Sequence, residues 1–135
     1  MAAPDAGTAP ARLRRVWFAA GLALVAAVVW LSLAPLPAPP GEHTDKLEHL
    51  VTYAFLMLWF AQLGGARRGL VAAAALVALG AGIELLQALT PYRRMDPADM
   101  VANALGVALG LLAAPPRTPN VLERLERRFG RRAAG

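Results

Sequence analysis

The sequence predicts an all-α integral membrane protein, a bundle of four transmembrane helices followed by a short cytoplasmic amphipathic helix. The chain of 135 residues is 57% hydrophobic, which is high for a soluble domain of this length. Its apolar residues collect in separate runs with little or no charge inside them. The sequence has no cysteine, which excludes disulfides and thiolate metal sites, and it lacks the basic, aromatic-rich face that nucleic-acid binding needs.

The four apolar runs give the expected transmembrane helices, at residues 16–34, 45–63, 69–89 and 97–114. The first run is free of charged residues and, at about 1.5 Å per residue, reaches roughly 28 Å, enough to cross a bilayer. It is longer than the apolar core of a signal peptide, so we expect a retained helix. Residues 1–11 read as a disordered leader, 12–114 as the transmembrane domain and 115–135 as a basic cytoplasmic tail.

Local signals mark where several helices begin. Thr44 is the expected N-cap of the second helix. Asp96, followed by a proline at the first helical position and by Asp99 at the third, is a stronger start signal for the fourth. Asn120 and Glu123 form a capping box in the tail, which predicts a basic amphipathic helix on an anionic leaflet; a solvated extension is the alternative.

Charge distribution sets the expected topology. Most of the 14 basic residues lie in the N-terminal segment, in the turn after the second run and in the tail, and only Lys46, Arg93 and Arg94 lie at the opposite helix ends. The positive-inside rule then places both termini in the cytoplasm of a bacterial inner membrane. The second, third and fourth helices therefore meet at the outer face.

Ionisable and polar residues gather at these outer helix ends. Glu84 is the most informative of them, because a carboxylate in an apolar run is costly in a bilayer and is a default indication of function. Glu84 and Gln87 share one helix face, as do Asp45, His49 and Tyr53. The predicted ligand-binding residues are Asp45, Lys46, His49, Tyr53, Glu84, Gln87, Arg93, Asp99 and Asn103.

Three segments of the sequence resemble the VanZ-like family of small bacterial membrane proteins. They are DKLEH with Tyr53, the ExxQ pair at Glu84 and Gln87, and YRRMDPADMVANALG. The resemblance covers about residues 32–112 and includes each predicted ligand-binding residue and Gly106, with Arg93 matched because it stands six residues before Asp99. The family is named for a protein associated with low-level teicoplanin resistance, so the resemblance implies a role in the cell envelope, with a link to glycopeptide resistance. It implies no particular reaction.

The first functional hypothesis is a binding site for an anionic envelope lipid or a lipid-linked cell-wall precursor. Arg93 would bind a phosphate or carboxylate bidentately, Lys46 would add a second positive charge, and Gln87 and Asn103 would donate or accept hydrogen bonds. Membrane lipids are thus the expected partners, together with a homodimer through the GxxxG pair of Gly106 and Gly110.

Two alternatives stay open. In a membrane-embedded hydrolase or transferase acting on a lipid-linked substrate, His49, Glu84 and Asp99 are the catalytic candidates, as general acids and bases or as ligands of a divalent metal. The sequence has no nucleophile motif, and we predict no cofactor and no metal. In a purely structural protein, the same cluster would only tie the helix ends together. Trp17, Trp30 and Trp59 are expected to be interface anchors or lipid-facing side chains.

Overall fold

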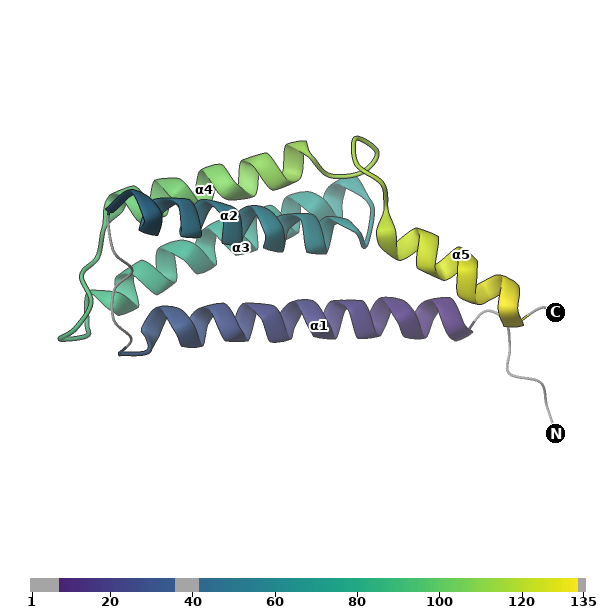
Figure 1. The fold of residues 1–135 in the computed structure, drawn as a ribbon, viewed down its shortest axis with the longest axis horizontal. Coiled ribbons are helices and arrows are strands. Elements are labelled where there is room, and N and C mark those ends of the chain that lie inside the picture. Colours follow the sequence, from purple (N-terminus) through teal and green to yellow (C-terminus); the bar gives the residue numbers. More distant parts are fainter. Residues whose placement is uncertain (1–7, 36–41, 134–135) are drawn as a thin grey trace.

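The all-α prediction is confirmed by a computed structural model, which describes residues 8–35 and 42–133. Within these residues the chain forms helices and no strands. The helices are α1 (Thr8–Leu33), α2 (Glu42–Ala61), α3 (Ala66–Gln87), α4 (Pro97–Leu112) and α5 (Val121–Ala133). Helices α1 to α4 form an elongated bundle, and α5 leaves one end of it and runs back toward the start of α1 (Figure 1).

The helix starts agree with the sequence in part. Asp96 caps α4 as predicted, because its Oδ1 accepts a hydrogen bond of 2.8 Å from the Ala98 amide. At α5, Asn120 Oδ1 accepts from the Glu123 amide at 3.0 Å, which is one half of the predicted capping box. The Glu123 carboxylate instead binds Arg127, at 2.7 Å.

Three helices begin earlier than predicted, α2 and α3 by three residues and α1 by eight. Helix α2 already begins at Glu42, so Thr44 lies inside the helix and is not its N-cap. Residues 42–44 contain no proline, so nothing in the sequence prevents the helix from beginning before Thr44. Helix α1 begins at Thr8, inside the predicted leader, because alanine and arginine both favour a helix before the apolar run. The rest of that leader, residues 1–7, lies outside the described residues.

Two of the described helices are long and apolar enough to cross a membrane: Ala11–Leu33 within α1 and the whole of α3. Helix α4 is apolar but has 16 residues, about 24 Å at 1.5 Å per residue. Helix α2 carries Asp45, Lys46 and Glu48 in its first turns, which lowers its mean hydropathy. Length and composition therefore support two of the four predicted spans.

The closest packing in the bundle is between α2 and α4. A Cβ atom placed on Gly106 would lie 2.3 Å from the Leu50 carbonyl oxygen, and one on Gly110 would lie 2.6 Å from that of Ala54. Neither position has room for a side chain, so the GxxxG pair brings α4 against α2 within one chain. A homodimer built on these two glycines would have to displace α2; dimerisation itself stays a prediction.

Helix α5 is attached to the start of α1. Arg14 forms an ion pair with Glu126 at 3.2 Å and also donates to the carbonyl oxygen of Leu63. Leu122 is fully buried, and the Val121 amide donates to Gln62 Oε1 at 2.7 Å. The tail is therefore a helix docked on the bundle. The start of α1 and helix α5 lie at this end, and the start of α2, the end of α3 and the start of α4 lie at the other (Figure 1).

Candidate functional site

The predicted site residues meet at the end of the bundle opposite the start of α1. They come from the first four turns of α2, the last turn of α3, the loop that follows it and the first two turns of α4. Short connections reverse the chain direction between these helices, which is why residues far apart in sequence share one end. The side chains form two adjoining parts, a hydrogen-bonded network and a cavity.

Lys46 links the start of α2 to the start of α4. Its Nζ lies 2.5 Å from Asp96 Oδ2 and 2.6 Å from Asp99 Oδ1. Asp96 thus has two roles, as a helix cap and as an ion-pair partner, whereas the sequence indicated only the cap. The hydrogen bond from Lys46, and after it that from the Ala98 amide, lowers the pKa of the Asp96 carboxyl below its ordinary value of 3.8.

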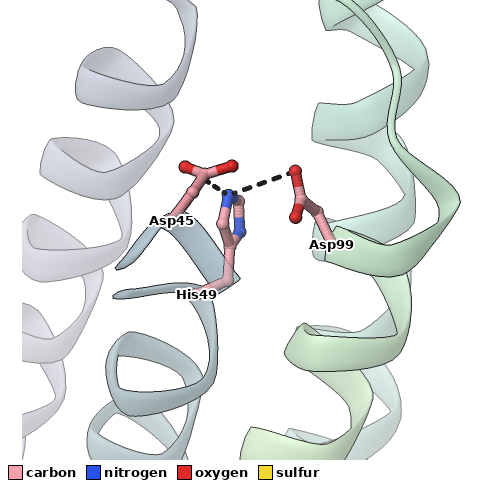
Figure 2. A group of neighbouring side chains, drawn as sticks. All are labelled: Asp45, His49 and Asp99. Atoms are coloured by element: carbon pink, nitrogen blue, oxygen red, sulfur yellow. Dashed lines mark ion pairs between the residues drawn. The ribbon is translucent and has the colours of Figure 1, made fainter. Parts of the chain in front are cut away.

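The His49 imidazole stands between two carboxylates (Figure 2). Its Nε2 is 3.7 Å from Asp99 Oδ2 and 3.9 Å from Asp45 Oδ1. On the other side of the ring, Nδ1 is 2.9 Å from Asn103 Oδ1. An amide oxygen only accepts hydrogen bonds, so His49 Nδ1 carries the proton in this contact. Asp99 therefore uses one carboxylate oxygen for Lys46 and turns the other toward His49.

Glycine in α3 makes room for this arrangement. A Cβ atom on Gly80 would lie 3.0 Å from Asn103 Nδ2 and 3.3 Å from the Tyr53 ring. A larger residue would push Asn103 away from His49. Gly80 thus allows the close helix approach expected of small residues in membrane bundles.

Glu84 and Gln87, at the end of α3, each form one hydrogen bond to a neighbouring segment. Glu84 is 0% exposed; its Oε2 accepts from the Asp96 amide at 3.1 Å, and its Oε1 has no hydrogen-bond partner among the described residues. Gln87 Nε2 donates to the Ser32 carbonyl oxygen at 2.9 Å, which connects α3 to the end of α1.

A cavity of about 370 Å³ lies beside this network. Helix α1 supplies an apolar wall, and α2, α3 and the loop before α4 supply a polar one. The lining residues are Val28, Leu31, Ser32, Asp45, Glu48, His49, Thr52, Tyr53, Gln87 and Arg93. The buried Nε of Arg93 and the buried hydroxyl of Tyr53 have no hydrogen-bond partner among the described residues. Arg93 also forms no ion pair with any described residue.

The structure places each predicted site residue in the cavity wall or in the network, and His49 belongs to both. The cavity wall contains Asp45, His49, Tyr53, Gln87 and Arg93, and the network contains Lys46, Glu84, Asp99 and Asn103. Sequence reasoning missed two groups of cavity residues. Glu48 and Thr52 follow Asp45 along nearly the same face of α2, so helical spacing could have indicated them. Val28, Leu31 and Ser32 lie in a uniformly apolar run that gives no signal for one face.

Comparison with protein families finds a match over most of the chain. The family model described as VanZ/LLP1 matches residues 15–118, which is most of the chain and includes every residue of the predicted site. The resemblance seen in the sequence is confirmed. No curated protein and no solved structure matches the chain.

Proposed function

The chain belongs to the VanZ/LLP1 family and is a membrane protein with apolar helices, and we propose that it binds the anionic head group of an envelope lipid or lipid-linked cell-wall precursor. The head group would occupy the cavity beside His49, with Arg93 as its main ligand. This cavity would lie at the outer surface of the bacterial cytoplasmic membrane.

The proposed topology has four membrane-spanning helices, α1 to α4, with both termini in the cytoplasm. The positive-inside rule supports it, because the basic residues of the tail and of the α2–α3 turn lie at the end opposite the cavity. Helices α2 and α4 would span the bilayer inside the bundle, where their polar first turns reach the outer interface. A polar site at that depth is accessible to lipid head groups without crossing the hydrocarbon core.

The observation that carries the proposal is the Arg93 side chain in the cavity wall. Its Nε is buried and has no hydrogen-bond partner among the described residues. A buried donor without a partner costs about 1–3 kcal/mol, and a ligand oxygen at that position would remove this cost. Guanidinium also matches phosphate and carboxylate oxygens in a bidentate geometry that an ammonium group lacks.

The two-sided lining fits a lipid better than a soluble anion. Val28 and Leu31 of α1 line the same cavity as Arg93 with apolar side chains, and Leu31 is 48% exposed. A head group could therefore sit against the polar wall while its chain leaves along α1. A volume of about 370 Å³ is at the lower end of the range for ligand pockets and suits a head group rather than an entire lipid.

Lipid retention by matched arginine variants tests the proposal. The readout is native mass spectrometry of protein purified in mild detergent. The amount of anionic lipid bound to Arg93→Ala should be at least about tenfold lower than the amount bound to the wild type. The neighbouring Arg94 is exposed and does not line the cavity, so Arg94→Ala is the matched control and should retain the lipid. Arg93→Lys should bind weakly, because it keeps the charge but not the bidentate geometry. Equal retention by Arg93→Ala and wild type would contradict the proposal.

The link to glycopeptides has its own test. If the protein contributes to teicoplanin resistance through this site, its expression in a sensitive bacterium should raise the tolerated teicoplanin concentration. Arg93→Ala should abolish the increase and Arg94→Ala should not. An increase that survives Arg93→Ala would separate resistance from head-group binding.

A membrane-embedded hydrolase or transferase is the second candidate. The observation that favours it is the position of His49 in the same cavity wall as Arg93. A phosphate held by Arg93 would then have an imidazole near it as general acid or base, oriented by its neighbours. Incubation of purified protein with a polyprenyl diphosphate should release inorganic phosphate under this hypothesis, and His49→Gln should abolish that release. Binding without turnover would exclude hydrolysis of this substrate.

A further inference from the structure

From the group around His49 we propose a site for a divalent transition metal ion, Zn²⁺ or Mn²⁺, with Asp45, His49 and Asp99 as its protein ligands. One ligand atom from each lies within 4.8 Å of the others. This inference goes beyond head-group binding and stands without it, since it concerns the ion alone. It also differs from the set expected from the sequence: Asp45 takes the place of Glu84, whose Oε2 is bound to the Asp96 amide.

The distances at His49 suit an ion better than direct hydrogen bonds. Its Nε2 is 3.7 Å from Asp99 Oδ2 and 3.9 Å from Asp45 Oδ1 (Figure 2), whereas charge-assisted N–H···O bonds are about 2.7–2.9 Å long. In a tetrahedral zinc site with bonds of about 2.1 Å, neighbouring ligand atoms are roughly 3.4 Å apart. An ion between the three side chains therefore needs only small side-chain movements.

The imidazole is oriented as a metal ligand. Its Nδ1–H donates to Asn103 Oδ1 at 2.9 Å, so Nε2 is the ring nitrogen that faces the two carboxylates. Metal-binding histidines nearly always have this second hydrogen bond, which fixes the tautomer and the ring plane. Gly80, which leaves room for Asn103, supports the same orientation.

A second, independent feature indicates a ligand at this position. Tyr53 is 2% exposed, lines the same cavity as Asp45 and His49, and its hydroxyl has no hydrogen-bond partner among the described residues. It lies one turn beyond His49 on the same face of α2. A water molecule bound to the metal could accept from or donate to this hydroxyl. Three protein ligands with an open position toward a cavity are the arrangement of metal sites that bind further ligands.

The ligand types select the class of metal. One imidazole nitrogen with two carboxylate oxygens suits Zn²⁺ or Mn²⁺, whereas Ca²⁺ and Mg²⁺ prefer oxygen ligands alone. Two carboxylates balance the charge of a divalent ion. Lys46 binds the second oxygen of Asp99 and is itself shared with Asp96, so it orients Asp99 but competes for its negative charge.

Direct metal titration of the purified full-length protein tests the site. With Zn²⁺ measured by competition against a chromogenic chelator, we expect about one ion per chain. Asp45→Asn and His49→Gln should each weaken binding at least about tenfold. Glu48→Gln is the matched control, because Glu48 lies beside His49 and lines the cavity but is outside the ligand set; its affinity should stay within about twofold of wild type. Unchanged affinity in Asp45→Asn, or no Zn²⁺ uptake by the wild type, would overturn the proposal.

Two further measurements separate metal binding from a structural role. Asp45 is partly exposed, so Asp45→Asn should fold as the wild type does. If His49→Gln does not fold, the Zn²⁺ affinity of Asp45→Asn alone tests whether these side chains bind the metal. Lys46→Met should bind Zn²⁺ as tightly as the wild type or more tightly, since a competing positive charge is removed from Asp99. A loss of metal affinity in Lys46→Met equal to that in Asp45→Asn would contradict direct ligation and indicate general damage to the cluster.

Discussion

Trp17 of α1 and Trp59 of α2 are joined by two reciprocal hydrogen bonds. The indole Nε1 of Trp17 donates to the Trp59 carbonyl oxygen at 3.0 Å, and the Nε1 of Trp59 donates to the Trp17 carbonyl oxygen at 3.1 Å. The two rings stack with centroids 4.1 Å apart and planes 11° from parallel. These two tryptophans therefore hold α1 against α2, whereas the sequence indicated anchors or lipid-facing side chains. Trp30, which is 66% exposed, fits that earlier expectation.

The first prediction concerns this pair. Trp17→Phe keeps an aromatic ring but removes one indole donor, and we expect it to lower the free energy of unfolding by about 1 kcal/mol. Trp17→Ala should lower it further, by at least about 0.5–1.5 kcal/mol, because the stacking is lost together with the buried surface of the ring. Thermal unfolding in detergent measures both. Trp30→Phe, on an exposed face of the same helix, is the control and should change stability by less than about 0.5 kcal/mol. Equal effects at Trp17 and Trp30 would show that the pair contributes nothing.

The second prediction uses two glycines with opposite surroundings. A Cβ on Gly106 would lie 2.3 Å from a backbone oxygen of α2, so Gly106→Ala should force the helices apart and lower stability by about 1–3 kcal/mol. A Cβ on Gly82 would meet nothing within 4 Å, and alanine favours a helix more than glycine does. Gly82→Ala should therefore raise stability, by up to about 1 kcal/mol. The measurement is the unfolding midpoint in one detergent for both variants, and a stable Gly106→Ala would contradict the close packing of α4 on α2.

The third prediction is a pH dependence at Asp96. The pKa of this carboxyl is lowered in the folded protein, first by Lys46 and then by the Ala98 amide. A lowered folded-state pKa means that the contribution to stability is complete above the ordinary value of 3.8 and is lost as the pH falls through the lower folded value. Asparagine also caps helices well, so Asp96→Asn removes the charge and keeps the cap.

Unfolding midpoints measured between about pH 6 and pH 2 check this effect. Asp96→Asn should be less stable than the wild type at pH 6, and the difference should shrink below pH 3.8. Lys46→Met should flatten the acid limb of the profile in the same way, because it removes the main cause of the shift. A constant difference between Asp96→Asn and wild type over the whole pH range would refute the ion pair as its source.

The parts of the site that could be predicted are those that depend on position along the chain. The start of α4 has three local signals in the sequence, and the observed start agrees with them. The meeting of Lys46, Glu84 and Asp99 at one end of the bundle follows from short connections between consecutive helices. Both predictions require only that the ends of the helices are known. Neither requires knowledge of how a helix is rotated about its own axis.

The parts that could not be predicted depend on helix rotation. The run in α1 is apolar on every side, so nothing in it indicates that Val28 and Leu31 face the cavity while Trp30 faces outward. The GxxxG pair predicts close contact with some helix, but the spacing does not say whether that helix belongs to the same chain. The ion pair of Lys46 with Asp96 likewise requires the relative depth of α2 and α4 in the bundle.

The last prediction concerns topology, and the absence of cysteine makes it simple to test. A single cysteine at an exposed position at each end of the bundle reports which side of the membrane that end faces. Met95, in the loop before α4, lies at the cavity end, and Ala66, at the start of α3, lies at the end that holds the start of α1 and helix α5. In intact spheroplasts a membrane-impermeant maleimide should label Met95→Cys and leave Ala66→Cys unlabelled until the membrane is permeabilised. Because the two sites lie at opposite ends of the bundle, the reverse pattern would place the cavity in the cytoplasm, and labelling of both would contradict a membrane-spanning bundle.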